Sequence, residues 1–179
     1  MMKATTRLPL YVCLISLLAL LASPLSRSDS HGSLPLKDLQ IVNLKHPSTG
    51  VYTSGQPTQA QLQGLAKSGV KRIINLRPPG ESDLDEKTIV EALGMEYVNI
   101  PVAGASGVTP ANAQQLEKLL QDSSKPTLVH CASSNRVGAL VALAAGKDAT
   151  SSEQVDAAIA KGKQYGLGSL EPVVRKQLD

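Results

Sequence analysis

The stretch Thr127–Ala145 constrains the fold of this chain more than any other. Thr127–His130 is an apolar, strand-like run, Cys131–Arg136 is a short polar loop, and Val137–Ala145 is a run of small apolar residues with helical character. A strand that passes through a tight loop into a helix is a building unit of layered α/β folds. The sequence therefore predicts that Cys131 lies at the carboxyl end of a buried strand, beside the first turn of a helix.

Cys131 and Arg136 are the candidate catalytic residues. Backbone N–H groups in such a loop, together with a helix N-terminus, attract an anion and stabilise a thiolate. An arginine can donate two parallel hydrogen bonds to an oxyanion. A thiol nucleophile, an anion cradle and an arginine indicate attack on a phosphate ester or on a sulfur donor. A buried structural cysteine, or anion binding without turnover, are the alternatives.

Strand-like and helix-like segments alternate along the rest of the chain. Expected strands are 51–53, 70–76, 96–100 and 127–130, with a weaker strand or short packed segment at 39–44 and a turn at 46–50. Expected helices begin after Thr58, Ser82 or Asp83, Thr109, Arg136 and Ser152, and a last one covers 170–178. This order predicts an α/β fold of three layers, with a mainly parallel sheet flanked by helices. The loops 77–81, 101–108 and 131–136 then meet at one sheet edge.

The first 27 residues have the pattern of a secretory signal peptide. Met1–Arg7 is basic, Leu8–Ala22 is almost wholly apolar, and small residues follow. We therefore expect export across the inner membrane and a periplasmic location, or membrane attachment if the segment stays uncleaved. Residues 28–179 are expected to form one domain, with 28–38 as a flexible lead. Removal of the signal leaves Cys131 as the single cysteine of residues 28–179, so the thiol has no internal disulfide partner.

Charge and composition exclude some functions. The formal net charge of +3 includes Lys3, Arg7 and Arg27, so residues 28–179 are close to neutral and no nucleic-acid partner is expected. The three histidines are scattered, and a lone cysteine gives no zinc-ligand spacing, so no metal site is predicted.

Three motifs in order resemble a known family. His130–Arg136 is similar to the signature of cysteine-dependent protein tyrosine and dual-specificity phosphatases. Together with Val51–Pro57, and with Ile73–Pro78 followed by Glu81, it resembles more specifically the bacterial branch called beta-lactamase-hydrolase-like, phosphatase-like domains. The resemblance extends over about residues 39–143, and it implies a cysteine-dependent phosphatase-like fold.

The resemblance also implies roles for individual residues. Cys131 would attack phosphorus and form a thiophosphate intermediate, Arg136 would hold the phosphate oxygens, and His130 would support the cysteine. The implied substrate-binding residues are Ala132, Ser133, Ser134, Asn135, Arg77 and Gln56. No cofactor or metal is implied, and the partner would be a phosphorylated or sulfur-containing small molecule or protein.

The chain departs from the family pattern at three points. Four residues separate Cys131 from Arg136 instead of five, and Ser134 stands where relatives usually have glycine. The 101–107 loop has no carboxylate, although related phosphatases carry their general acid in that loop. Glu81, Asp83 and Asp85 are the possible substitutes. The short loop is also the length found in rhodaneses, so a sulfurtransferase that forms a Cys131 persulfide is one alternative. A non-catalytic oxyanion-binding module is another.

Overall fold

The computed structural model describes residues 36–179, so the predicted signal peptide and residues 28–35 of the expected lead lie outside the described residues. The strands are β1 (Lys45–Ser48), β2 (Val51–Ser54), β3 (Arg72–Asn75), β4 (Glu96–Asn99) and β5 (Thr127–His130). The helices are the 3-10 turn η1 (Leu36–Leu39), α1 (Gln59–Lys67), α2 (Glu86–Ala92), α3 (Pro110–Leu120), α4 (Asn135–Ala145), α5 (Ser152–Gln164) and α6 (Glu171–Leu178). None of the helices within residues 36–179 has the length and apolarity needed to cross a membrane.

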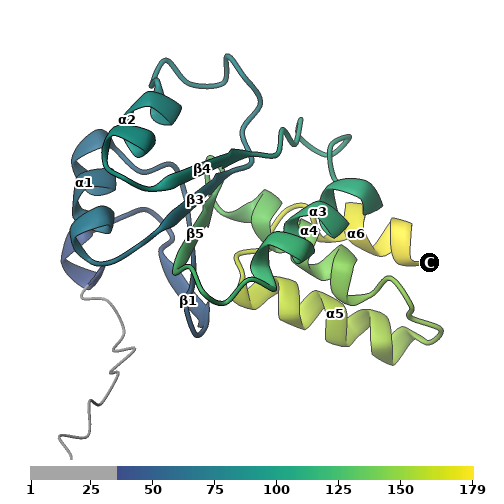
Figure 1. Ribbon diagram of the computed structural model, residues 1–179. Coiled ribbons are helices and arrows are strands. Elements are labelled where there is room, and N and C mark those ends of the chain that lie inside the picture. The colour runs from purple at the N-terminus through teal and green to yellow at the C-terminus, as the bar shows by residue number, and fades with distance from the viewer. Residues whose placement is uncertain (1–35) are drawn as a thin grey trace, which may run out of the picture. The chain divides into compact units, whose positions relative to one another are not determined.

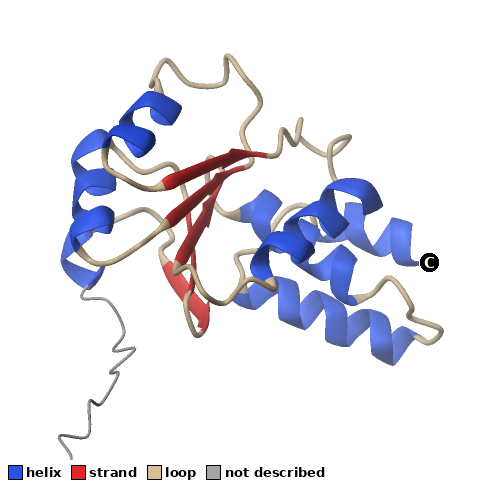
Figure 2. Ribbon diagram, in the orientation of Figure 1, coloured by secondary structure: helices blue, strands red, loops and turns tan. Residues whose placement is uncertain are grey.

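The five strands form one sheet in the order β1-β2-β5-β3-β4 (Figures 1 and 2). β1 is antiparallel to β2, and every other neighbouring pair is parallel. η1, α1 and α2 cover one face of the sheet, and α3, α4, α5 and α6 cover the other (Figure 1). Each face buries its own apolar cluster, built largely from leucine, isoleucine, valine and alanine. The expected three-layer α/β fold with a mainly parallel sheet is confirmed.

Strand register brings four loops to one edge of the sheet. Ser54 of β2 and Asn75 of β3 both pair with His130 of β5, and Asn75 also pairs with Asn99 of β4. These four residues form a single row across the parallel strands. The chain segments that follow them therefore leave the sheet side by side, as expected for the carboxyl edge of a parallel sheet.

Local capping chemistry explains where α1 and α3 begin. The Thr58 hydroxyl accepts from the backbone N–H of Gln61, and the Gln61 side chain accepts from the backbone N–H of Thr58, which completes a capping box. Thr109 caps α3 in the same way through Asn112, with Pro110 at the first helical position. Both helices start where the sequence predicted.

Several expected boundaries were wrong. The weaker expectation at 39–44 is a short packed segment with buried Ile41 and no strand, because residues 42–43 form a turn and Gln40 and Asn43 lie in the left-handed region (φ 46° and 53°). The expected 46–50 turn is partly strand, because β1 is an edge strand, where Pro47 costs no central ladder hydrogen bond. The expected lead ends earlier than predicted, since Leu36 is buried in η1.

Three helix starts also differ from the prediction. α2 begins at Glu86 because the side chain of Asp85 accepts from the N–H of Thr88, so neither Ser82 nor Asp83 is the cap. α4 begins at Asn135, two residues before the expected start, which places Arg136 in its first turn. α5 is capped by Ser151 instead of Ser152.

Candidate active site

Cys131 lies at the carboxyl end of β5, at the centre of the row of loops. Its residue exposure is 1%, and its N–H donates to the carbonyl of Ser54 on β2 at 3.4 Å. On the other side, the His130 carbonyl accepts from the N–H of Leu76 at 2.8 Å. The cysteine is thus held between the ends of β2 and β3, as predicted from the strand–loop–helix pattern.

Three carbonyl groups of the loop accept hydrogen bonds from outside it, and a fourth lies near a ring nitrogen of His130. The Cys131 carbonyl lies 3.4 Å from Nδ1 of His130. The Ala132 carbonyl accepts from the N–H of Gln56 at 3.3 Å. The Ser133 carbonyl accepts from the side chain of Asn43 at 3.1 Å. The Ser134 carbonyl accepts from the N–H of Gly138 at 3.1 Å, inside α4.

This pattern fixes the direction of the N–H groups. In a trans peptide the N–H of the next residue points opposite to the carbonyl. The N–H groups that follow these carbonyls therefore point away from the partners of the carbonyls. Backbone N–H groups that converge form an anion-binding concavity. The loop is therefore a candidate anion-binding site next to the thiol.

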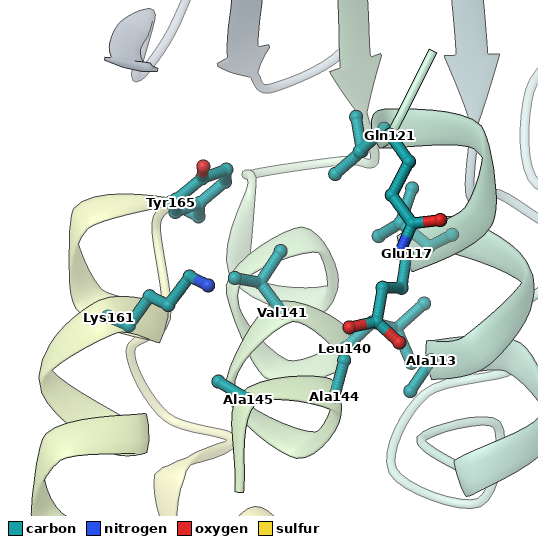
Figure 3. Close-up of a pocket in the computed structure, with 11 residues that line it drawn as sticks. Ala113, Glu117, Gln121, Leu140, Val141, Ala144, Ala145, Lys161 and Tyr165 are labelled. Carbon is teal, nitrogen blue, oxygen red and sulfur yellow. The ribbon is translucent and has the colours of Figure 1, made fainter.

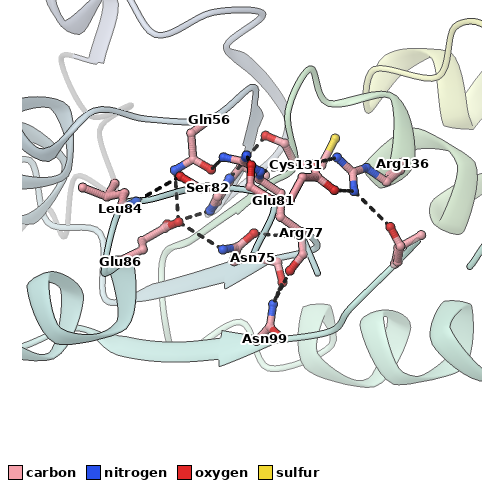
Figure 4. Close-up of polar contacts among 12 residues, drawn as sticks. Gln56, Asn75, Arg77, Glu81, Ser82, Leu84, Glu86, Asn99, Cys131 and Arg136 are labelled. Atoms are coloured by element: carbon pink, nitrogen blue, oxygen red, sulfur yellow. Dashed lines mark hydrogen bonds and ion pairs between the residues drawn. The ribbon is translucent and has the colours of Figure 1, made fainter. Parts of the chain in front are cut away.

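Arg136 completes the cradle from the first turn of α4. Nη1 donates to Glu81 Oε2 at 2.8 Å and to the Val102 carbonyl at 2.9 Å, and Nη2 donates to Glu81 Oε1 at 2.5 Å. These bonds use three of the five guanidinium N–H groups. The sulfur of Cys131 lies beside Arg136 (Figure 4). The hydrogen bond to Glu81 is the largest cause of the raised pKa of Arg136, and the neighbouring Cys131 raises this pKa further.

Glu81, one of the three candidate acids, is held as a carboxylate. It pairs with Arg136 and also accepts from Nε of Arg77 at 3.1 Å. The Arg136 hydrogen bond is the main cause that lowers the pKa of Glu81 below its usual range. A carboxylate in this state has no proton to give to a leaving group at neutral pH. The geometry thus assigns Glu81 to orienting Arg136.

The other two candidate acids occupy different positions. Asp85 caps α2 through the N–H of Thr88 at 3.3 Å, and Asp83 is exposed. In the loop after β4, the Val102 carbonyl contacts Arg136, but residues 101–108 supply no carboxylate. Of the three candidate acids, only Glu81 contacts Arg136, and it does so as the acceptor of the hydrogen bonds.

Gln56 and Arg77 belong to a polar network beneath the loop (Figure 4). Nη1 of Arg77 donates to Oε1 of Gln56 at 2.6 Å, and Nε2 of Gln56 donates to Glu86 Oε2 at 3.0 Å. Arg77 also donates to the Glu81 carbonyl. Their side chains brace the loops after β2 and β3 against each other. No contact places either side chain inside the anion cradle.

His130 is supported by a residue that the sequence reading did not select. Nε2 of His130 lies 2.7 Å from Glu86 Oε1, and both side chains are buried, at 0% and 4% exposure. Asn75 donates to the other oxygen of Glu86 at 3.1 Å. Helical spacing held a signal for Glu86, because it lies four residues before the inward-facing Val90.

The loop residues Ser134 and Asn135 face away from the cradle. Ser134 has the left-handed conformation (φ 72°) that its replacement of a glycine suggested, and its hydroxyl donates to the Tyr165 carbonyl at 2.9 Å. The Asn135 side chain binds Ser169 and the N–H of Gly168, both at 2.8 Å. Either residue can contact a bound anion only through its backbone N–H.

A separate cavity of about 210 Å³ lies between α3, α4 and α5 (Figure 3). Leu116, Leu140 and Val141 give it an apolar floor, and Lys161 and Glu117 lie at its sides. None of the predicted site residues lines it. Within residues 36–179, no group of three or more histidine, cysteine, aspartate or glutamate side chains could hold a metal ion.

Two curated bacterial proteins share sequence with this chain. Both are called beta-lactamase hydrolase-like protein. The one from Agrobacterium fabrum is 34% identical over 50% of this chain and 22% of its own length. The one from Xylella fastidiosa (strain Temecula1) is 32% identical over 64% of this chain and 26% of its own length. The match thus spans about a quarter of these longer relatives.

Solved structures share the fold. A DUF442 protein from Shewanella putrefaciens CN-32 is 26% identical, with a TM-score of 0.55 over 79% of this chain and 95% of that chain. A variant of TpbA from P. aeruginosa, solved in complex with pTyr, is 19% identical, with a TM-score of 0.53 over 75% of this chain and 85% of that chain.

A family model covers most of the described residues. The model for the DSP-PTPase phosphatase fused to NAD+ kinase matches residues 37–175. This span includes the three motifs on which the resemblance was based and every residue of the cradle. The chain therefore belongs to the DSP-PTPase phosphatase family that this model describes, and it is similar to the beta-lactamase hydrolase-like proteins.

Proposed function

We propose that this protein is a cysteine-dependent phosphatase that hydrolyses phosphate monoesters through a thiophosphate intermediate on Cys131. One observation carries the proposal: the carbonyls of Ala132, Ser133 and Ser134 accept hydrogen bonds from groups outside the loop, which supports an arrangement in which loop N–H groups face an anion beside the thiol. Arg136 adds its two remaining N–H groups, Nε–H and one on Nη2, which lie along a single edge of the guanidinium. That edge can bind two oxygens of a phosphate.

The covalent step follows from this placement. The Cys131 thiolate attacks phosphorus, so that an S–P bond forms while the P–O bond to the leaving group breaks. The leaving oxygen departs with the electron pair. Water then attacks phosphorus, the S–P bond breaks, the thiolate is regenerated and inorganic phosphate leaves. The loop N–H groups and Arg136 hold the equatorial oxygens, on which negative charge lies throughout.

The ionised state of Glu81 has a consequence for substrate preference. Without a protonated side chain to donate to the leaving oxygen, that oxygen must depart as an anion or take its proton from water. Loss of general acid catalysis costs about 10²–10⁴-fold. Esters of acidic alcohols, such as aryl phosphates, are therefore expected to react faster than alkyl phosphates. The pTyr complex of TpbA supports a phosphorylated substrate for this fold.

Sulfur transfer is the second candidate function. Four residues between Cys131 and Arg136 form a smaller ring than the usual phosphatase loop, and a smaller ring suits a persulfide better than a tetrahedral phosphate. In that reaction the Cys131 thiolate would take the outer sulfur of thiosulfate, release sulfite and pass the sulfur to cyanide. The two activities have different products, so one assay pair separates them.

The test uses purified residues 28–179 with an aryl phosphate and, in parallel, with thiosulfate and cyanide. We expect phosphate release that is abolished in Cys131→Ser and reduced by at least about 10²-fold in Arg136→Ala. Arg175→Ala, which removes an exposed ion-paired arginine on α6, is the matched control and should keep full activity. Thiocyanate formation with no phosphate release would replace the phosphatase assignment by sulfur transfer.

We also propose that residues 1–27 direct the protein across the inner membrane. The basic start, the apolar run 8–22 and the small residues after it support this. Fractionation of cells that produce the full chain should place it in the periplasm, shortened at a site between Ala22 and Ser28. A full-length product in the cytoplasm would contradict export.

A further inference from the structure

Ser134 occupies the N-cap position of α4 without capping it. A serine at this position normally accepts a hydrogen bond from an N–H of the first turn. Here its side chain makes no such bond, and the hydroxyl donates instead to the carbonyl of Tyr165, in a fully buried position. The first N–H groups of α4 are therefore left without a cap from this hydroxyl, on the side that faces the anion cradle.

The carbonyl that holds Ser134 belongs to the end of α5. Gly166 N–H donates to the Lys163 carbonyl at 3.2 Å, and Leu167 N–H donates to the Gly162 carbonyl at 2.9 Å. These two bonds, with Gly166 at φ 106°, form a Schellman motif. Hydrogen bonds within the motif fix the direction of the Tyr165 carbonyl.

Gly166 lies directly against Ser134. A Cβ atom at position 166 would stand 2.4 Å from Oγ and 2.6 Å from Cβ of Ser134, which is closer than real contacts allow. Glycine at 166 is thus needed twice, for its backbone conformation and for the space that Ser134 fills. A serine in the left-handed region is strained relative to glycine, and the hydrogen bond to the Tyr165 carbonyl opposes that strain.

The next loop residue is held by the same segment. Oδ1 of Asn135 accepts from the N–H of Gly168 at 2.8 Å and of Leu170 at 3.4 Å, and Nδ2 donates to Ser169 at 2.8 Å. One turn further along α4, a Cβ on Gly138 would come within 2.0 Å of the Leu167 nitrogen. Segment 165–170 therefore contacts three successive parts of the loop and helix that hold the anion.

We propose that segment 165–170, the α5 bracket, sets the geometry of the anion cradle, with Ser134 and Asn135 as positioning residues. The bracket withdraws the Ser134 hydroxyl from the helix terminus and keeps the Ser134 backbone left-handed without glycine. It thereby leaves the N–H groups of the first turn of α4 open to an oxyanion. This inference rests on the proposed function, because the ligand it serves is the phosphate bound at Cys131.

The first test compares alanine substitutions at two helix N-cap positions, Ser134 of α4 and Ser151 of α5. Ser134→Ala should weaken binding of inorganic phosphate by about fivefold, the equivalent of one lost hydrogen bond. Ser151→Ala is the matched control: it removes the N-cap of α5, lowers the stability of the protein modestly and lies outside the bracket. It should leave the phosphate dissociation constant unchanged. Equal phosphate affinity in Ser134→Ala and the original protein would overturn the role of Ser134.

The second test uses the contact between positions 134 and 166. Gly166→Ala should weaken phosphate binding by at least about tenfold, because the new methyl group displaces Ser134 from the cradle. Adding Ser134→Gly removes both clashing atoms, so the double variant should regain most of the phosphate affinity while it keeps the stability loss of alanine at φ 106°. If affinity in the double variant stays at the Gly166→Ala level, the bracket does not act through Ser134.

Phosphate binding and turnover are measured separately, so the two proposals fail differently. Binding by calorimetry needs no catalysis and can be repeated in Cys131→Ser. If bracket variants change phosphate affinity but the original protein releases no phosphate from aryl esters, the bracket stands and the phosphatase assignment fails. If turnover depends on Cys131 and Arg136 but the bracket variants bind phosphate as tightly as the original protein, the phosphatase assignment stands and the bracket proposal fails.

Discussion

The carboxylate of Glu81 holds the guanidinium of Arg136 through both oxygens, at 2.8 Å and 2.5 Å. This bond occupies the outer end of the guanidinium and leaves one side edge directed at the cradle. Because Arg136 can rotate about several side-chain bonds, a fixed partner is what makes the edge available in one orientation.

Glu81→Gln is expected to lower kcat/KM for an aryl phosphate by about 10–100-fold. The amide keeps the size of the side chain, but its NH2 group cannot accept from Arg136, so the bidentate pair is lost. Glu91→Gln, an exposed position on α2, is the control and should match the original protein. Steady-state kinetics checks both variants. If Glu81 were the general acid, the loss would instead grow steadily as the leaving group becomes less acidic.

Asn43→Gly is expected to weaken phosphate binding by about three- to tenfold. The Asn43 amide holds the Ser133 carbonyl outward, and glycine keeps the left-handed backbone (φ 53°) while it removes the amide. Gln40→Gly is the matched control, because Gln40 is also left-handed (φ 46°) and exposed. Calorimetric titration with phosphate distinguishes them, and equal affinities would show that the Ser133 carbonyl needs no anchor.

Glu86→Ala is expected to destabilise the protein by about 3–5 kcal/mol. It removes a buried carboxylate and leaves His130, Gln56 and Asn75 without their shared acceptor. Glu91→Ala on the same helix should change stability by less than about 0.5 kcal/mol, because Glu91 is exposed. Urea unfolding measures both. A small loss in Glu86→Ala would mean that water replaces the carboxylate.

Acidic pH is expected to lower the stability of the folded protein, because it protonates the carboxylate of Asp122. Hydrogen bonds from Ser124 and from the buried Arg72 lower the pKa of Asp122 to about 2. A carboxyl whose pKa is lower in the folded state stabilises the protein above its unfolded pKa of about 3.9, and this contribution is lost as pH falls through the folded value. Stability should therefore fall between pH 4 and 2 more steeply in the original protein than in Asp122→Asn. Parallel curves would contradict the assignment.

Gly138→Ala is expected to destabilise the folded protein by about 3 kcal/mol or more. The added methyl group would stand 2.0 Å from the backbone nitrogen of Leu167, and backbone cannot move aside cheaply. Gly64→Ala is the comparison, since its methyl group would meet only the flexible end of the Leu39 side chain at 2.3 Å. Alanine is favoured over glycine in a helix by about 1 kcal/mol, and this gain offsets the cost of moving the Leu39 side chain. Thermal or urea unfolding should separate the two variants clearly.

Short-range patterns in the sequence predicted most of the fold. The Thr58 and Thr109 caps, the strand at 127–130 and the alternation of strands with helices depend on residues within a few positions of each other. The same reasoning failed at 39–50, where an exposed edge strand and a turn with two left-handed residues carry little apolar periodicity.

The residues that meet at the candidate active site were harder to predict from the sequence than the fold. The sequence places Cys131 and Arg136 together because they share one loop and helix start. Glu81 meets Arg136 from 55 positions away, and Glu86 meets His130 from 44 positions away. No spacing rule connects such pairs, so the sequence alone leaves Glu81 as a possible acid and assigns no role to Glu86.

The sequence by itself determined a three-layer α/β chain with a cysteine loop at the carboxyl edge of a mainly parallel sheet. Periodicity and capping are local, so they can be read without coordinates. Only the tertiary structure decided what each side chain of that edge does: Glu81 orients Arg136, Asn43 holds the loop from outside, and Tyr165 withdraws the Ser134 hydroxyl. These roles depend on which distant segments the strand register and helix packing bring within hydrogen-bond reach, and hydrogen bonds act only over about 3 Å.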